Sequence, residues 1–106
     1  MKSTPPLRSG KTTAAVIALL LAASPLAQAE ISRGAVMAST CFACHGTDGK
    51  STGAIPSIYG IPADSLIATM KAFREDLRAA TVMNRHAKGY TDEEIVHIAN
   101  YLSNIK

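Results

Sequence analysis

The sequence predicts a small all-α domain. Two stretches in the C-terminal half carry apolar residues at spacings of three and four, from about residue 62 to 77 and from 91 to 105. This spacing is typical of helices with one buried face. No stretch alternates apolar and polar residues as a half-buried strand would. We therefore expect short helices around one core, without a β-sheet.

The first 29 residues predict a secretory signal peptide. Lys2, Arg8 and Lys11 precede an unbroken apolar run over residues 14–23, and residues 27–29 form an A-x-A cleavage triplet. The run has about ten residues, whereas a helix needs roughly 20 to span a bilayer. An uncleaved anchor is the alternative. We expect residues 1–29 to be removed, so that residues 30–106 form a periplasmic domain without a membrane span.

Removal of this leader changes the charge balance and the size. Three of the 11 Lys and Arg residues lie in the leader, so eight remain against eight Asp and Glu. The formal net charge of +3 is thus largely a targeting signal, and a whole-chain argument for nucleic-acid binding fails. The remaining 77 of the 106 residues are marginal for a self-sufficient core. A domain of this size usually needs a staple, meaning a disulfide, a metal or another added constraint.

The motif over residues 41–45 supplies that staple. It reads C-F-A-C-H, the C-x-x-C-H attachment sequence of a c-type haem. Each thiol can form a thioether to a haem vinyl group, and His45 brings an imidazole to the iron. We expect one haem c, covalent through Cys41 and Cys44, and no disulfide. A thioredoxin-like dithiol is the weaker alternative, because no βαβ pattern surrounds the cysteines.

The segments around the motif predict a helix before it and a loop after it. Residues 31–40 suit a short helix, in which the small residues Gly34 and Ala38 allow close helix crossing. Residues 46–53 contain three glycines and predict a loop. Residues 54–60 are expected to be extended around Pro56.

Two longer helices follow. The first is predicted from about Pro62 to Leu77, with an apolar face made by Leu66, Ile67, Met70, Phe73 and Leu77. Residues 79–90 look irregular. The last helix should begin at the capping box of residues 91–94, T-D-E-E, and its apolar stripe consists of Ile95, Ile98, Ala99, Leu102 and Ile105.

The residues also suggest the axial ligands. Electron-transfer haems are typically bound by His on one side and Met on the other, and His45 is fixed by the motif. Met37 lies too close to the motif, and Met70 lies on an apolar helix face. Met83 lies in an irregular segment that can cross a haem face, so it is the preferred metal ligand together with His45. His86 and Met70 remain alternatives.

Pro56 is the candidate partner of His45. A ligating imidazole usually donates its other N–H to a carbonyl or carboxylate. The Pro56 carbonyl can accept such a bond, and it lies one loop beyond the motif. A plain turn proline is the alternative.

Three segments in this order resemble the class I c-type cytochromes: C-F-A-C-H-G, P-S-I-Y-G and M-N-R-H-A-K-G-Y-T-D-E-E-I-V-H-I-A-N-Y-L. The resemblance covers residues 35–105. It is nearest to the cytochrome c4 and c553 branch, and especially to the haem subunit of flavocytochrome c sulfide dehydrogenases.

The resemblance implies the small single-haem cytochrome c fold, with crossed N- and C-terminal helices. The family's thioether cysteines fall on Cys41 and Cys44, its axial ligands on His45 and Met83, and its proline carbonyl acceptor on Pro56. Two-haem sulfide-dehydrogenase cytochromes carry a second haem domain, whereas this sequence ends at residue 106. A single-haem form or a free carrier is therefore expected.

Together these features predict a periplasmic electron-transfer protein rather than an enzyme. By resemblance it is the cytochrome subunit that accepts electrons from a flavoprotein sulfide dehydrogenase, in sulfur oxidation. A free soluble monohaem carrier is the alternative. An open iron site, as in a haem enzyme or gas sensor, would require that Met83 does not bind. A cationic set could steer an acidic partner, although a solvated helix face is the ordinary interpretation of it: Lys71, Arg74, Arg78, Arg85 and Lys88.

Overall fold

The structure is a computed structural model that describes residues 1–6 and 31–106. The apolar run and the cleavage triplet fall in residues 7–30, outside the described residues, so the signal peptide stays a prediction. In the part that is described, no helix is both long enough and apolar enough to cross a membrane.

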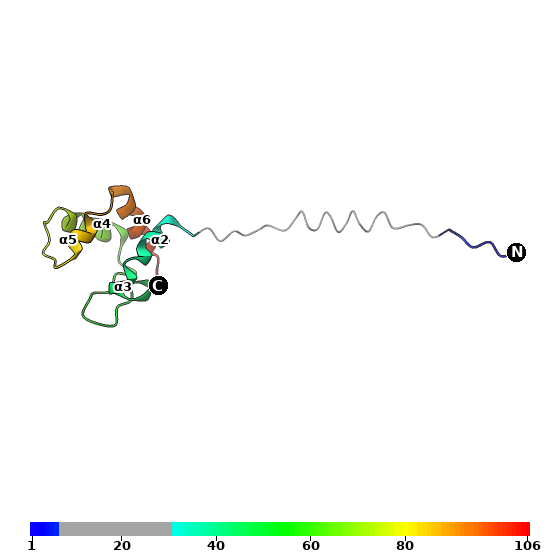
Figure 1. Cartoon of the computed structure of the whole chain (residues 1–106), viewed down its shortest axis with the longest axis horizontal. Helices are drawn as coiled ribbons and strands as arrows, with labels where there is room; N and C mark the ends of the chain where they lie inside the picture. The colour runs from blue at the N-terminus through cyan, green and yellow to red at the C-terminus, as the bar shows by residue number, and fades with distance from the viewer. Residues whose placement is uncertain (7–30) are drawn as a thin grey trace.

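Short helices make up the regular structure of the domain (Figure 1). They are α2 (Arg33–Ser39), α3 (Phe42–His45), the 3-10 turn η1 (Thr47–Gly49), α4 (Ala63–Arg74), α5 (Met83–Ala87) and α6 (Asp92–Ser103). Neither of the described ranges contains a β-strand. The all-α class is confirmed.

The crossing of α2 with α6 depends on a glycine. Gly34 is buried in α2, and a Cβ atom there would collide with the carbonyl oxygen of His97 and lie 3.0 Å from the Cβ of Tyr101. One turn later Ala38 is fully buried, in the same core cluster as Leu102. Because the side chains at a crossing set how closely two helices approach, these small residues let the two backbones pack together. The predicted crossing of the first and last helices is confirmed.

Helix α6 begins and packs as the sequence predicts. The Oγ1 of Thr91 accepts the N–H of Glu94 at 3.2 Å, and the carboxylate of Glu94 accepts the N–H of Thr91 at 2.9 Å. This is the predicted capping box. Four residues of its apolar stripe are buried and form most of the core: Ile95, Ile98, Ala99 and Leu102. Helices α2 and α4 both pack against α6.

Helix α4 ends earlier than predicted, at Arg74 rather than Leu77. Asp76 adopts a left-handed conformation with φ of 56°. Its N–H donates to the Phe73 carbonyl at 3.2 Å, and the N–H of Leu77 donates to the Ala72 carbonyl at 2.8 Å. These two bonds form a Schellman C-cap. Leu77 therefore leaves the apolar face, and 78% of it is exposed.

The segment predicted to be irregular contains the short helix α5. Its first residue is Met83, and its last residue, Ala87, is fully buried. Its N-cap, Val82, makes no side-chain capping bond. The sequence thus carried no local signal for this helix. Since so short a helix is not stable alone, we attribute it to packing against α4.

We expect Gly34→Ala to destabilise the domain because its methyl group would meet the backbone of α6. Overpacking of this kind costs about 1–3 kcal/mol, and the better helix propensity of Ala offsets at most about 1 kcal/mol of it. Urea unfolding measures the loss. The matched control is Gly53→Ala, where a Cβ atom would meet nothing within 4 Å. Equal midpoints for the two variants would contradict the role given to Gly34.

Candidate functional site

One helical turn brings the two thiols and the imidazole of the motif together. Cys41 is the N-cap of α3, and its carbonyl accepts the N–H of Cys44 at 3.3 Å and the N–H of His45 at 2.9 Å. Residues three and four apart lie on the same face of a helix. The side chains of Cys41, Cys44 and His45 therefore share one face of α3.

The two cysteines differ in their surroundings. Both are free thiols, and Cys44 is exposed whereas Cys41 is half-buried. Burial raises the pKa of the Cys41 thiol, and a hydrogen bond with Thr40 partly offsets the rise. Both thiols are thus present for a covalent attachment, and the Cys41 thiol stays protonated at neutral pH.

His45 is buried and its ring is oriented by the chain. Only 8% of the residue is exposed, and Nδ1 lies 2.6 Å from the carbonyl oxygen of Pro56. Because a carbonyl can only accept a hydrogen bond, Nδ1 carries the proton and donates. The lone pair of Nε2 is then available to a metal. The structure thus contains the contact with Pro56 that the sequence analysis expects.

The loop between α3 and α4 is folded so that Pro56 reaches His45. The N–H of Ile58 donates to the Gly49 carbonyl at 2.8 Å, and the N–H of Ser51 donates to the Oγ of Ser57 at 2.9 Å. Gly49 is left-handed with φ of 73°, and a Cβ atom on it would lie 2.9 Å from the Ile58 side chain. Contacts of the two residues that directly follow Pro56 therefore hold its carbonyl in place. The glycines of this loop predict it from the sequence, but the roles of Gly49 and Ser57 were missed.

The methionines lie in different surroundings. Met37 packs against the core cluster. Met70 lies within α4 and Met83 begins α5, and both are half-buried. His86, the alternative ligand on α5, is exposed. Cys41 to His45 and Pro56 are thus gathered at α3, whereas Met83 lies on the separate pair of packed helices α4 and α5 (Figure 1).

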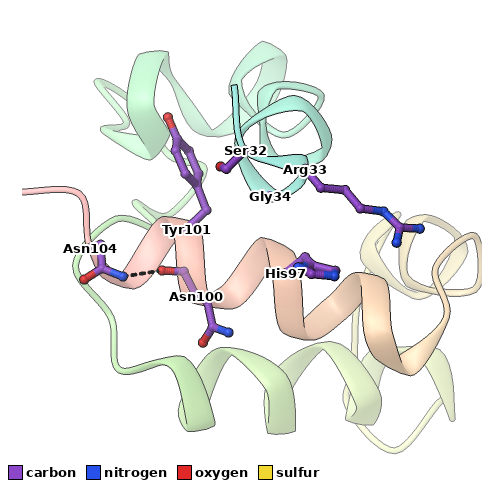
Figure 2. Close-up of a pocket in the computed structure, with 7 residues that line it drawn as sticks. All are labelled: Ser32, Arg33, Gly34, His97, Asn100, Tyr101 and Asn104. Carbon is purple, nitrogen blue, oxygen red and sulfur yellow. Dashed lines mark hydrogen bonds between the residues drawn. The ribbon is translucent and has the colours of Figure 1, made fainter. Parts of the chain in front are cut away.

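A hollow of about 560 Å³ lies away from the motif, at the crossing of α2 and α6 (Figure 2). Several of its polar groups have partners within the chain. Arg33 donates to Glu93 at 3.1 Å, the Nε2 of His97 lies 3.4 Å from Glu93, and Asn104 donates to the Asn100 carbonyl at 2.7 Å. None of the lining residues belongs to the motif, so this hollow marks the helix crossing and not the candidate site.

The residues gathered at α3 fit a covalently bound haem. The donor set comprises two free thiols and a buried imidazole whose Nε2 is available. Large apolar side chains are exposed on the loop after α3 and on the segment before α5, among them Ile55, Leu77 and Val82. Exposed apolar side chains of this kind suit an apolar ligand.

Comparison with known proteins agrees with a covalently bound haem at this site. Residues 31–106 match the family Cytochrome c. The chain is 49% identical over 74 residues to the cytochrome subunit of sulfide dehydrogenase of Chlorobaculum tepidum, covering 70% of this chain and 67% of that protein. It is 43% identical over 68 residues to cytochrome c-554(548) of Halomonas halodenitrificans, covering 60% of this chain and 82% of that protein. Cytochrome c-553 of Nitratidesulfovibrio vulgaris is 31% identical over 77 residues, with 68% and 76% covered.

We expect Gly49→Ala to loosen the bond between His45 and Pro56. The left-handed backbone disfavours Ala by about 1–2 kcal/mol, and the added methyl group would push on Ile58 and move the loop. The Nδ1 proton of His45 should exchange with solvent faster, as measured by NMR of the reduced holo-protein. Gly60→Ala is the matched control, because Gly60 is also left-handed (φ of 64°) and its nearest contact is the Ile105 carbonyl. The prediction is wrong if both variants speed this exchange equally.

Proposed function

The chain belongs to the cytochrome c family, and from this premise we propose that His45 and Met83 are the axial ligands of its haem c. The family and the relatives identify the chain as an electron-transfer protein and haem c as its cofactor. We further propose that Cys41 and Cys44 hold this haem through thioethers. The resemblance drawn from the sequence is thereby confirmed at the level of the family.

The observation that carries the ligand proposal is the hydrogen bond from His45 to Pro56. It fixes the tautomer and the direction of the ring, and it leaves Nε2 to bind iron. Bound haem supplies an iron that alternates between the ferrous and ferric states, and its potential depends on axial ligands, hydrogen bonding and burial. The chain supplies a buried imidazole, held by a backbone carbonyl that cannot titrate.

Met83 is favoured over the other candidates by its surroundings. It is half-buried at the start of α5, directly after an irregular segment, whereas His86 is exposed. Met37 is engaged by the core. Met70 is also half-buried and is therefore the strongest alternative ligand. With Met83 bound, both axial positions of the iron are filled, which suits electron transfer rather than binding of a substrate or a gas.

The domain division and the location form part of the same proposal. Residues 1–29 would be a signal peptide and residues 30–106 the cytochrome c domain, exported to the periplasm. The support is the basic region, the short apolar run and the A-x-A triplet of the sequence.

We propose a flavoprotein sulfide dehydrogenase as the electron donor, with this chain as its cytochrome subunit. The support is the 49% identity to a cytochrome subunit of sulfide dehydrogenase. The alternative is a free carrier, because the chain is also similar to cytochromes c-554(548) and c-553, whose names mention no dehydrogenase. Both arrangements use the same haem site and differ in how tightly the partner is held.

Part of the cationic set is paired with carboxylates within the chain. Asp92 accepts from Lys71 at 3.0 Å and from Arg74 at 2.5 Å, and Asp76 accepts from Lys88 at 2.6 Å. Three of the five cations therefore pair with a carboxylate, and Lys71 and Arg74 share Asp92. Since exposed pairs of this kind present little net field, we favour the solvated-face interpretation of these charges over steering of an acidic partner.

Replacing Met83 tests the ligation. In Met83→Ala the oxidised holo-protein should lose the weak far-red band that reports sulfur bound to iron. The reduced protein should bind carbon monoxide readily, and the potential should fall because Met/His ligation raises it. Met70→Ala is the matched control and should keep the band. An unchanged spectrum of Met83→Ala, or loss of the band in Met70→Ala, would contradict the assignment of Met83 as the axial ligand.

The partner is tested by purifying the protein from its native host under mild conditions. The subunit arrangement predicts that the haem elutes in a fixed ratio with flavin absorbance on gel filtration. Elution of all the haem at the size of the single domain, without flavin, would support the free carrier instead.

A further inference from the structure

The segment between α4 and α5 makes few backbone hydrogen bonds of its own. It comprises residues 77–82, and in the described chain none of the amides of residues 78–82 donates to a backbone carbonyl. Leu77 and Val82 are exposed. Met83 follows this segment directly, so few backbone hydrogen bonds before it fix the position of that side chain.

Asp76 bridges this segment from one end to the other. One carboxylate oxygen accepts the side-chain N–H of Asn84 at 3.2 Å, and the other accepts from the Nζ of Lys88 at 2.6 Å. Asn84 follows Met83 directly, and Lys88 is the C-cap of α5. The backbone of Asp76 is itself anchored by the Schellman cap of α4. A single side chain thus joins the end of α4 to both ends of α5.

Asp is well suited to this place. Its φ of 56° lies in the left-handed region, which Asp and Asn tolerate better than other residues with a side chain. Hydrogen bonds from Lys88 and from Asn84 hold the pKa of Asp76 below its usual range. The carboxylate is therefore ionised at neutral pH, and both of its bonds are charge-assisted.

We infer that Asp76 is a positioning residue that holds Met83 in place for the iron, an inference that rests on the ligation proposed above. A thioether is a neutral, weak ligand, and a competitor enters when the segment carrying it opens. The apparent affinity of a competitor therefore rises with the fraction of open segment. Loss of the Asp76 bridge increases that fraction while the core around α6 stays folded.

The test is titration of the oxidised holo-protein with imidazole, which displaces the methionine. Asp76→Asn keeps the size of the side chain and tolerates the left-handed backbone, but it loses the charge that pairs with Lys88. Imidazole should bind roughly three- to fivefold tighter to this variant. Lys88→Gln removes the same pair from the other side and should act in the same direction.

Asp92→Asn is the matched control. Like Asp76, Asp92 is an exposed carboxylate with two side-chain donors, in its case the cations Arg74 and Lys71, and hydrogen bonds from them lower its pKa. It joins α4 to α6 instead, so its variant should bind imidazole within about twofold of the parent. A purely structural role of Asp76 would make the two Asp variants alike.

The outcomes separate this inference from the ligand assignment. If the parent protein lacks the sulfur-to-iron band, the ligation by Met83 is wrong and the inference falls with it. If the parent shows the band, equal imidazole affinity of Asp76→Asn and the parent overturns the role of Asp76 alone. An equal increase in Asp92→Asn does so too. Should Asp76→Asn fail to fold, Lys88→Gln decides by the same criterion.

Discussion

The hydrogen bond from His45 to Pro56 is the contact on which the arrangement of the site depends. A buried imidazole without a partner would cost free energy, so the loop after α3 must fold back to supply one. Gly49 makes this possible, because its left-handed backbone and missing side chain let Ile58 pack beside it. The same bond satisfies Nδ1 and leaves the lone pair of Nε2 available to a metal. Folding of the loop therefore also orients the imidazole of His45, the proposed iron ligand.

The packing of α2 on α6 carries this site. The N–H of Cys41 donates to the Ala38 carbonyl at 2.9 Å, so the motif begins where the crossing helix ends. The core is small, and Ile95 is the largest fully buried side chain in the described part of the chain. A domain of this size needs an additional staple. A haem attached to α3 would complete the core as well as perform the electron transfer, which explains why a chain with so few buried residues can fold.

Local chemistry decided which features the sequence could predict. The capping box at Thr91 and the C-x-x-C-H motif act through residues close together in the sequence, and both were predicted. Gly34 was predicted from its small size, although the residues that it contacts lie on α6. The early end of α4 and the existence of α5 were not. The end of α4 depends on the left-handed backbone of Asp76, and α5 depends on packing against α4 and on the bonds from Asn84 and Lys88 to Asp76, which join residues 8 and 12 positions apart. The pairing of cations with Asp92 and Asp76 was likewise missed, because composition gives the charges and not their neighbours.

The central claim is that Met83 lies on the iron opposite His45. The most direct measurement is proton NMR of the reduced holo-protein, in which the ring current of the haem shifts the methyl group of a bound methionine far upfield. The account predicts one such methyl resonance, with through-space contacts to Asn84 and Ala87 that assign it to Met83. Assignment of that resonance to Met70, or a reduced protein without any upfield-shifted methionine methyl, would contradict the account.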